Sequence, residues 1–173
     1  MGLFLDITKE DRLMKLVITI SRRYGTGASQ IAGELSEQLG IPVYDKTHVE
    51  EKMCSNSYDS EAAVIKELAM KPCIILGRCA SEILKDQKNV FNIYVCADRK
   101  DRIARIMKKE NISEEEAAKK LDATDAERSE YYYEHTGKAW GDVNNYHMIL
   151  NTSDIGVDRC ADALIRYFEQ KEI

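Results

Sequence analysis

The fold is decided by residues 15–30, KLVITISRRYGTGASQ, where an apolar run leads directly into a turn with two glycines. Residues 16–20 are aliphatic or β-branched and carry no charge, which predicts a buried strand. Apolar residues then recur at helical spacing over 28–39, ending before Gly40 and Pro42. A glycine turn between a strand and a helix lets backbone amides approach an anion. The stretch is therefore either a phosphate-binding loop or a simple tight turn.

The commonest phosphate-binding loop reads G-x-x-x-x-G-K-[ST], and this turn keeps only part of it. Gly27 fits the second glycine and Ser29 the hydroxyl position. Arg22 stands at the first glycine and Ala28 at the lysine. If the turn holds phosphate, the cation must come from elsewhere, and Arg22 or Arg23 is the nearest source.

The rest of the chain alternates short apolar runs with longer amphipathic ones, which is typical of a parallel sheet covered by helices. The predicted strands are 16–20, 42–44, 73–76, 90–96 and 147–151. The predicted helices are 28–39, 46–53, 60–70, 79–87, 98–109, 113–135 and 156–170. We expect one α/β domain over residues 1–173, with 1–14 as an extension or a short helix.

Composition excludes several classes of function. The formal net charge of −5 argues against a general nucleic-acid or anionic-membrane surface. There is no signal-peptide pattern and no apolar stretch of the ~20 residues that a membrane helix needs, so we expect a cytoplasmic protein. Five cysteines without a CxxC pair suggest neither a disulfide framework nor a zinc site. We assign no chemistry to His48, His135 or His147, which lack partners at motif spacing.

Basic residues gather where the carboxyl edge of the sheet is expected. Arg78 follows the third strand, where an arginine suits bidentate capture of an anion. Arg102 and Arg105 lie one turn apart on the next long helix. The alternative interpretation is that they belong to a basic helix face exposed to solvent. The highly charged helix 113–135 suits a lid over a polyanionic substrate.

These pieces together resemble the cytidylate kinase-like family of P-loop nucleoside monophosphate kinase relatives. The specific pieces are SRRYGTG at 21–27, GRCA at 77–80, DAER at 125–128 followed by tyrosines, and GKAWGD at 137–142. The resemblance runs from about Leu16 to Phe168. It implies a three-layer P-loop NTPase fold, with a five-stranded parallel sheet in the order 2-3-1-4-5 and a helical lid. It also implies transfer of a phosphoryl group from ATP, with Mg²⁺, to a nucleoside monophosphate that is most similar to CMP.

The resemblance also implies roles for individual residues. It places the ATP phosphates and Mg²⁺ on the glycine turn, with Ser29 as the magnesium ligand, and adenine near the end of the last strand. It places the acceptor on a segment at about 45–71 and a lid at about 110–142. The implied catalytic residues are Arg78, Lys120, Asp125 and Arg128. The implied ATP-binding residues are Arg22, Arg23, Gly25, Thr26, Gly27, Ala28, Ser29, Asn151 and Thr152. The implied acceptor-binding residues are Asp45, Arg78, Arg102 and Arg105.

The chain departs from the family at two points, and these leave alternatives open. Cys79 stands where authentic cytidylate kinases have an aspartate after the arginine, and the segment between strands two and three is short. The alternatives are a kinase for another small acceptor and a nucleotide-binding regulatory protein without useful turnover. Asn151 and Thr152 fit a helix N-cap equally well. The expected partners are small-molecule nucleotides, with no nucleic acid and no membrane, and the sequence does not choose between monomer and homodimer.

Overall fold

The computed structural model describes residues 15–170. Its sheet has the strands β1 (Val17–Arg22), β2 (Val43–Tyr44), β3 (Cys73–Leu76), β4 (Val90–Cys96) and β5 (Met148–Asn151). The order is β2-β3-β1-β4-β5, and every neighbouring pair is parallel. The predicted α/β fold with a five-stranded parallel sheet in this order is therefore confirmed.

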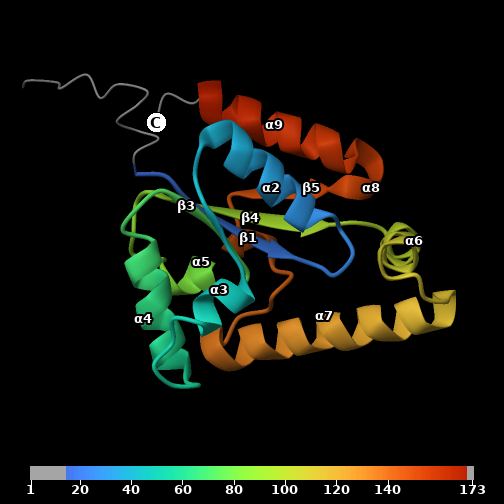
Figure 1. Cartoon of the computed structure of the whole chain (residues 1–173), viewed down its shortest axis with the longest axis horizontal. Coiled ribbons are helices and arrows are strands. Elements are labelled where there is room, and N and C mark those ends of the chain that lie inside the picture. The colour runs from blue at the N-terminus through green and yellow to red at the C-terminus, as the bar shows by residue number, and fades with distance from the viewer. Residues whose placement is uncertain (1–14, 171–173) are drawn as a thin grey trace, which may run out of the picture.

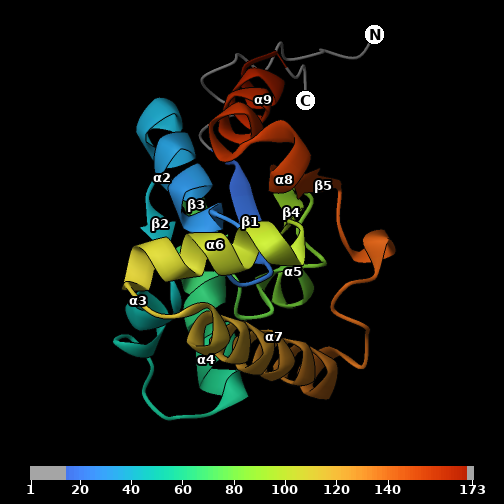
Figure 2. The same cartoon turned by 90° about the vertical axis from the view of Figure 1, so that its right-hand side faces the viewer.

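The sheet is covered on both faces, which makes three layers (Figures 1 and 2). The helices are α2 (Ala28–Leu39), α3 (Lys46–Glu50), α4 (Tyr58–Leu68), α5 (Ala80–Ile83), α6 (Arg99–Glu110), α7 (Glu114–Thr136), α8 (Thr152–Ile155) and α9 (Val157–Gln170), with a short 3₁₀ turn at Val143–Asn145. Helices α2 and α9 pack together on one face, and α4 and α5 lie on the other. Helix α7, with 23 residues, is the longest helix of the described residues. It lies on the same side of the sheet as α4 and α5 and packs against α6.

The central strand β1 shows why the apolar run decides the fold. Successive side chains of a strand point to opposite faces. Ile18 and Ile20 join the core under α2 and α9, while Val17 joins the core under α4 and α5. All three are fully buried. A strand whose side chains are buried in two cores must be apolar on both faces. This explains why residues 16–20 form a run without charged residues.

The elements differ from the sequence-based ranges in a few places. Strand β1 continues to Arg22, so this arginine is held by pairing with β4 instead of lying in the turn. The helix expected at 79–87 contracts to α5, and the one expected at 156–170 begins at Val157 after a separate turn, α8. The expected extension or helix at 1–14 lies outside the described residues.

Candidate active site

The turn after β1 presents unused backbone donors. Gly27 is the N-cap of α2, with φ of 84°. Within residues 15–170, no hydrogen bond engages the backbone N–H groups of residues 25 to 29. Free amides at the N-terminus of a helix favour an anion, because their dipoles point at it. The turn therefore has the donors that a phosphate cradle needs.

The glycines of this turn serve packing as well. Gly25 and Gly27 both have positive φ. A Cβ on Gly25 would lie 2.9 Å from the carbonyl oxygen of Arg102 on α6, and one on Gly27 would lie 2.6 Å from Cγ2 of Val157 on α9. The sequence predicts that these glycines let backbone amides approach a phosphate. The contacts show that they also allow α6 and α9 to pack against the loop.

Two cavities meet at this edge of the sheet. The first, which we call the loop cavity, has a volume of about 310 Å³. It is lined by residues 22–30 together with Arg105, Ile106, Lys109 and Arg128. Arg105 Nη1 donates to the carbonyl oxygen of Gly25 at 2.5 Å, which holds α6 against the turn. Lys109 is a cation of this cavity that sequence reasoning missed, although it follows Arg105 by one turn of α6.

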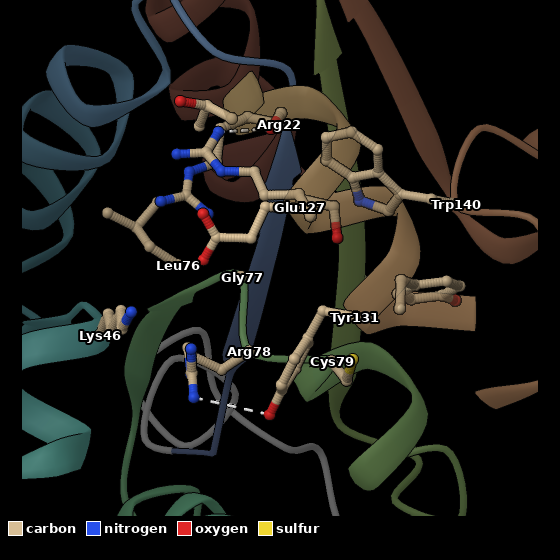
Figure 3. A pocket seen from close by; sticks show the side chains of 13 residues that line it. Arg22, Lys46, Leu76, Gly77, Arg78, Cys79, Glu127, Tyr131 and Trp140 are labelled. Carbon is tan, nitrogen blue, oxygen red and sulfur yellow. Dashed lines mark hydrogen bonds between the residues drawn. The ribbon is translucent and has the colours of Figure 1, made fainter. Parts of the chain in front are cut away.

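The second, the edge cavity, has a volume of about 260 Å³ and is shown in Figure 3. Its lining consists of Ser21, Arg22, Lys46, Leu76, Gly77, Arg78, Cys79, Thr124, Glu127, Arg128, Tyr131, Tyr132 and Trp140. Four of these are cations, which come from β1, α3, the turn after β3 and α7. The structure thus brings the predicted Arg22, Arg78 and Arg128 together, and adds Lys46, the first residue of α3.

Arg22 and Arg128 line both cavities. Arg128 Nη1 donates to the backbone carbonyl oxygen of Arg22 at 2.9 Å. Burial, and then the charge of Arg128, lowers the pKa of Arg22 to about 10, and burial lowers the pKa of Arg128 as well. A guanidinium stays charged at neutral pH even so. Two poorly solvated positive charges therefore lie at the boundary between the cavities, where an anion would relieve them.

Arg23 lines the loop cavity but not the edge cavity, and its side chain already has partners. Its Nη1 lies 3.5 Å from Oδ2 of Asp125, and its guanidinium lies 5.8 Å from the ring centroid of Trp140. Of the two arginines considered as substitutes for the missing lysine, Arg22 is the one that lines both cavities.

Asp125 and Arg102 form a buried connection between the turn, α6 and α7. Oδ1 of Asp125 accepts from the backbone N–H of Tyr24 at 2.8 Å, and its Oδ2 accepts from Arg102 Nη1 at 2.6 Å. Arg102 also donates to the carbonyl oxygens of Ala97 and Tyr24. Neither Asp125 nor Arg102 is part of the lining of the loop cavity or the edge cavity. In this structure both residues connect the loop to α6 and α7.

Four further predicted residues also lie outside the two linings. Lys120 pairs with Glu110, and Asp45 caps α3 by accepting from the backbone N–H of His48. Asn151 caps α8 by accepting from Ser153. Thr152 Oγ1 donates to the carbonyl oxygen of Thr26 at 2.8 Å, which fixes the end of β5 to the turn.

No dedicated metal cluster is present in the described part of the chain: residues 15–170 contain no group of three His, Cys, Asp or Glu side chains that could hold an ion. Ser29 is exposed on the loop cavity. A hydroxyl there suits Mg²⁺ that arrives with a nucleotide, because Mg²⁺ is commonly bound by few protein groups and by substrate phosphates. Over the same range, none of the helices is long and apolar enough to cross a membrane.

Comparison with known proteins shows which proteins this chain is similar to in sequence and in fold. The chain is 24% identical over 159 residues to a cytidylate kinase from Thermoplasma volcanium, covering 78% of this chain and 82% of that protein. The crystal structure of an uncharacterized protein from Eubacterium ventriosum superposes with a TM-score of 0.84 at 25% identity, covering 91% and 99% of the two chains. Shikimate kinase from Acinetobacter baumannii in complex with shikimate shares the fold, with a TM-score of 0.59 at 16% identity, covering 96% and 99%.

The family comparison covers most of the domain. The profile of the cytidylate kinase-like family matches residues 17–58 and 48–154, a range that runs from β1 into α8. Its matched range includes both cavities' arginines. The P-loop kinase fold and the family together point to a phosphotransferase. From the sequence match and the shared fold, the chain belongs to the cytidylate kinase-like family.

Proposed function

We propose that this protein transfers the γ-phosphoryl group of ATP to a nucleoside monophosphate, with a CMP-like acceptor. The observation that carries the proposal is that Arg22 and Arg128 line both cavities. A phosphoryl group that passes between donor and acceptor must cross such a boundary, and it carries negative charge throughout.

The loop cavity is the proposed site of the ATP phosphates. The free amides of residues 25 to 29 would cradle them, and Arg105 and Lys109 add positive charge from α6. Ser29 would contribute its hydroxyl to the magnesium ion. When bound, Mg²⁺ supplies charge neutralisation for the phosphates. The adenine-binding role implied for Asn151 and Thr152 stays a prediction. In the structure Asn151 caps α8, and Thr152 donates a hydrogen bond to the carbonyl oxygen of Thr26.

The edge cavity is the proposed acceptor site. Arg78 and Lys46 would hold the acceptor phosphate, and the aromatic rings of Tyr131 and Trp140 provide an apolar wall. We place the acceptor-binding segment at about 45–71 and the lid at about 110–142. Within these ranges α3, α7 and Trp140 contribute to the cavity.

Phosphoryl transfer needs positioning and positive charge more than covalent participation by the protein. Arg22 and Arg128 are the proposed cations for the transferring group. Asp125 and Arg102 act by positioning the turn and α7. Lys120 is held by Glu110 away from the cavities, so its proposed role requires α7 to move toward the nucleotide.

A coupled assay with ATP, Mg²⁺ and a panel of monophosphates tests the proposal. We expect turnover that is highest with CMP. Arg78→Ala should raise the acceptor KM or lower kcat by about 100-fold, because it removes a charge-assisted clamp, while ATP binding persists. Arg159→Ala, which removes an exposed arginine of α9, is the matched control and should behave as wild type. ATP binding without turnover on any monophosphate would instead support a regulatory protein, and equal loss of ATP binding in Arg78→Ala would contradict the role of that residue.

A further inference from the structure

A buried carboxylate lies beside the edge cavity, and none of the motifs pointed to it. Glu61 is on α4 and is only 1% exposed. A carboxylate so completely removed from water must be paired, since burying an isolated charge is very unfavourable. Its partners come from two other elements, the turn after β3 and α7.

Those partners are Arg78 and Tyr131. Arg78 Nη2 forms an ion pair with Oε2 of Glu61, and the hydroxyl of Tyr131 donates to Oε1 at 2.5 Å. Arg78 Nη2 also lies 3.5 Å from the Tyr131 hydroxyl, the contact drawn as a dashed line in Figure 3. The guanidinium carbon lies 4.9 Å from the centroid of the Tyr131 ring. One guanidinium is thus held at its edge by a carboxylate and on its face by an aromatic ring.

The backbone at this point is in an uncommon conformation. Arg78 and Cys79 have φ of 58° and 52°, in the left-handed region that non-glycine residues rarely occupy. Such a conformation persists only where surrounding contacts require it. The contacts of the Arg78 side chain with Glu61 and Tyr131 lie directly at this point of the chain.

Arg78 retains donors that the protein does not use. Its Nε is buried and has no hydrogen-bond partner among the described residues. A buried N–H without an acceptor is unfavourable, and such groups usually receive a ligand or a water molecule. The side chain lines the edge cavity. One edge of the guanidinium is therefore fixed by the protein, while the buried Nε–H still lacks an acceptor.

We propose that Glu61 and Tyr131 are positioning residues that fix Arg78 for the anionic group of the acceptor. The proposal rests on the proposed function of the edge cavity. Tyr131 lies one turn from Arg128 on α7, so the same helix carries a boundary cation and the residue that orients Arg78. A shift of α7 would break the Tyr131–Glu61 hydrogen bond, which couples the position of the lid helix to the acceptor clamp. Burial raises the pKa of Tyr131, so its hydroxyl remains a donor at neutral pH.

The test compares Tyr131→Phe and Glu61→Gln with matched controls on the same helices. Tyr133→Phe removes the hydroxyl of a 63% exposed tyrosine of α7, and Glu67→Gln removes the charge of an exposed glutamate of α4. The first readout needs no ligand: the ¹H–¹⁵N signal of the Arg78 Nε–H group, assigned by its loss in Arg78→Lys. We expect this signal in wild type and both controls, and its shift or disappearance in Tyr131→Phe and Glu61→Gln.

The second readout is steady-state kinetics with ATP and CMP. Misplacing Arg78 should raise the acceptor KM by about 10-fold to 100-fold. The KM for ATP should change by less than about twofold, because the loop cavity is intact. Tyr131→Phe removes a single hydroxyl and carries the test if Glu61→Gln does not fold.

The outcomes separate this inference from the proposed function. An Arg78 signal that is unchanged in both variants overturns the inference, whether or not the protein turns over CMP. A signal that is lost while the acceptor KM stays at the wild-type value also overturns it, because Arg78 would then not need fixing. Wild type that transfers phosphate to no monophosphate overturns the proposed function, while the signal loss would still establish the positioning of Arg78.

Discussion

At the scale of single residues, we infer that Arg22 supplies the positive charge that the missing lysine would bring to the turn after β1. This arginine is the last residue of β1, and pairing of the strand with β4 fixes its backbone. Its side chain lines both cavities, whereas Arg23 is engaged by Asp125. A cation at the end of a paired strand is placed more rigidly than one within a loop. Arg22 is therefore the arginine that we propose as the replacement for a lysine at the start of α2.

Gly27 gives a residue-scale prediction about stability. Alanine there must adopt a positive φ, costing about 1–2 kcal/mol, and its Cβ would press against Val157, costing about 1–3 kcal/mol more. Gly33→Ala on the same helix is the control: its Cβ would meet nothing within 4 Å, and the change should stabilise by about 0.5–1 kcal/mol. Urea unfolding of both variants measures the difference. A Gly27→Ala protein as stable as wild type would show that Val157 moves aside freely.

At the scale of elements, α6 and α7 are joined by two carboxylate–arginine pairs that differ in burial. Asp125 and Arg102 are buried, whereas Asp122 and Arg99 are 61% and 51% exposed in their side chains. Breaking a buried pair leaves an uncompensated charge, while an exposed pair is compensated by water. The exposed pair has two hydrogen bonds and the buried pair has one, but burial gives the buried pair the larger expected cost when it is broken.

The substitutions Asp125→Asn and Asp122→Asn separate these energies on one helix. Asp125→Asn should lower the free energy of unfolding by about 3 kcal/mol or more, because Arg102 stays buried without its counter-charge. It should also loosen the turn, since Asp125 accepts from the Tyr24 N–H. Asp122→Asn should leave the unfolding midpoint unchanged. Chemical denaturation measures both, and equal effects would mean that the buried pair is not what ties α7 to the loop.

At the scale of the whole molecule, the loop cavity is built from segments far apart in the chain. The turn after β1, α6 and α7 all contribute positive side chains to its lining. These positive side chains share the lining of one cavity. A polyphosphate ligand would neutralise them and hold the three segments together, so binding should stabilise the entire domain.

Mg²⁺-ADP at about 100 times its Kd should stabilise the protein by about 2.7 kcal/mol, provided that it binds only the folded state. For a domain of this size that is a rise in Tm of about 5–10 °C. Adenosine at the same concentration is the matched control and should raise Tm much less, because it lacks the phosphates. Added salt should reduce the ADP effect through screening. Differential scanning calorimetry measures these shifts, and equal stabilisation by adenosine would argue against the phosphate cradle.

The site itself was only partly predictable from sequence. Arg22, Arg78 and Arg128 belong to local motifs next to predicted strands and helices, and they do meet at one edge. Lys46 and Lys109 also line the cavities but belong to none of the motifs, and Glu127 occupies a variable position inside the motif at 125–128. Glu61 was missed because its importance lies in contacts with residues 17 and 70 positions away, which no local pattern encodes.

The sequence by itself determined the alternation of strands and helices, since apolar periodicity is a local property and each face of an element must find a core. Together with the family resemblance it also indicated the strand order and the edge where the cations gather. Only the tertiary structure decided the location and the partners of each cation. Arg22 lines both cavities, and Arg102 is paired with Asp125. Arg78 is held by Glu61 and Tyr131. The physical reason is that the effect of a charge depends on its burial and on its partners in space, and both are set by packing between distant segments.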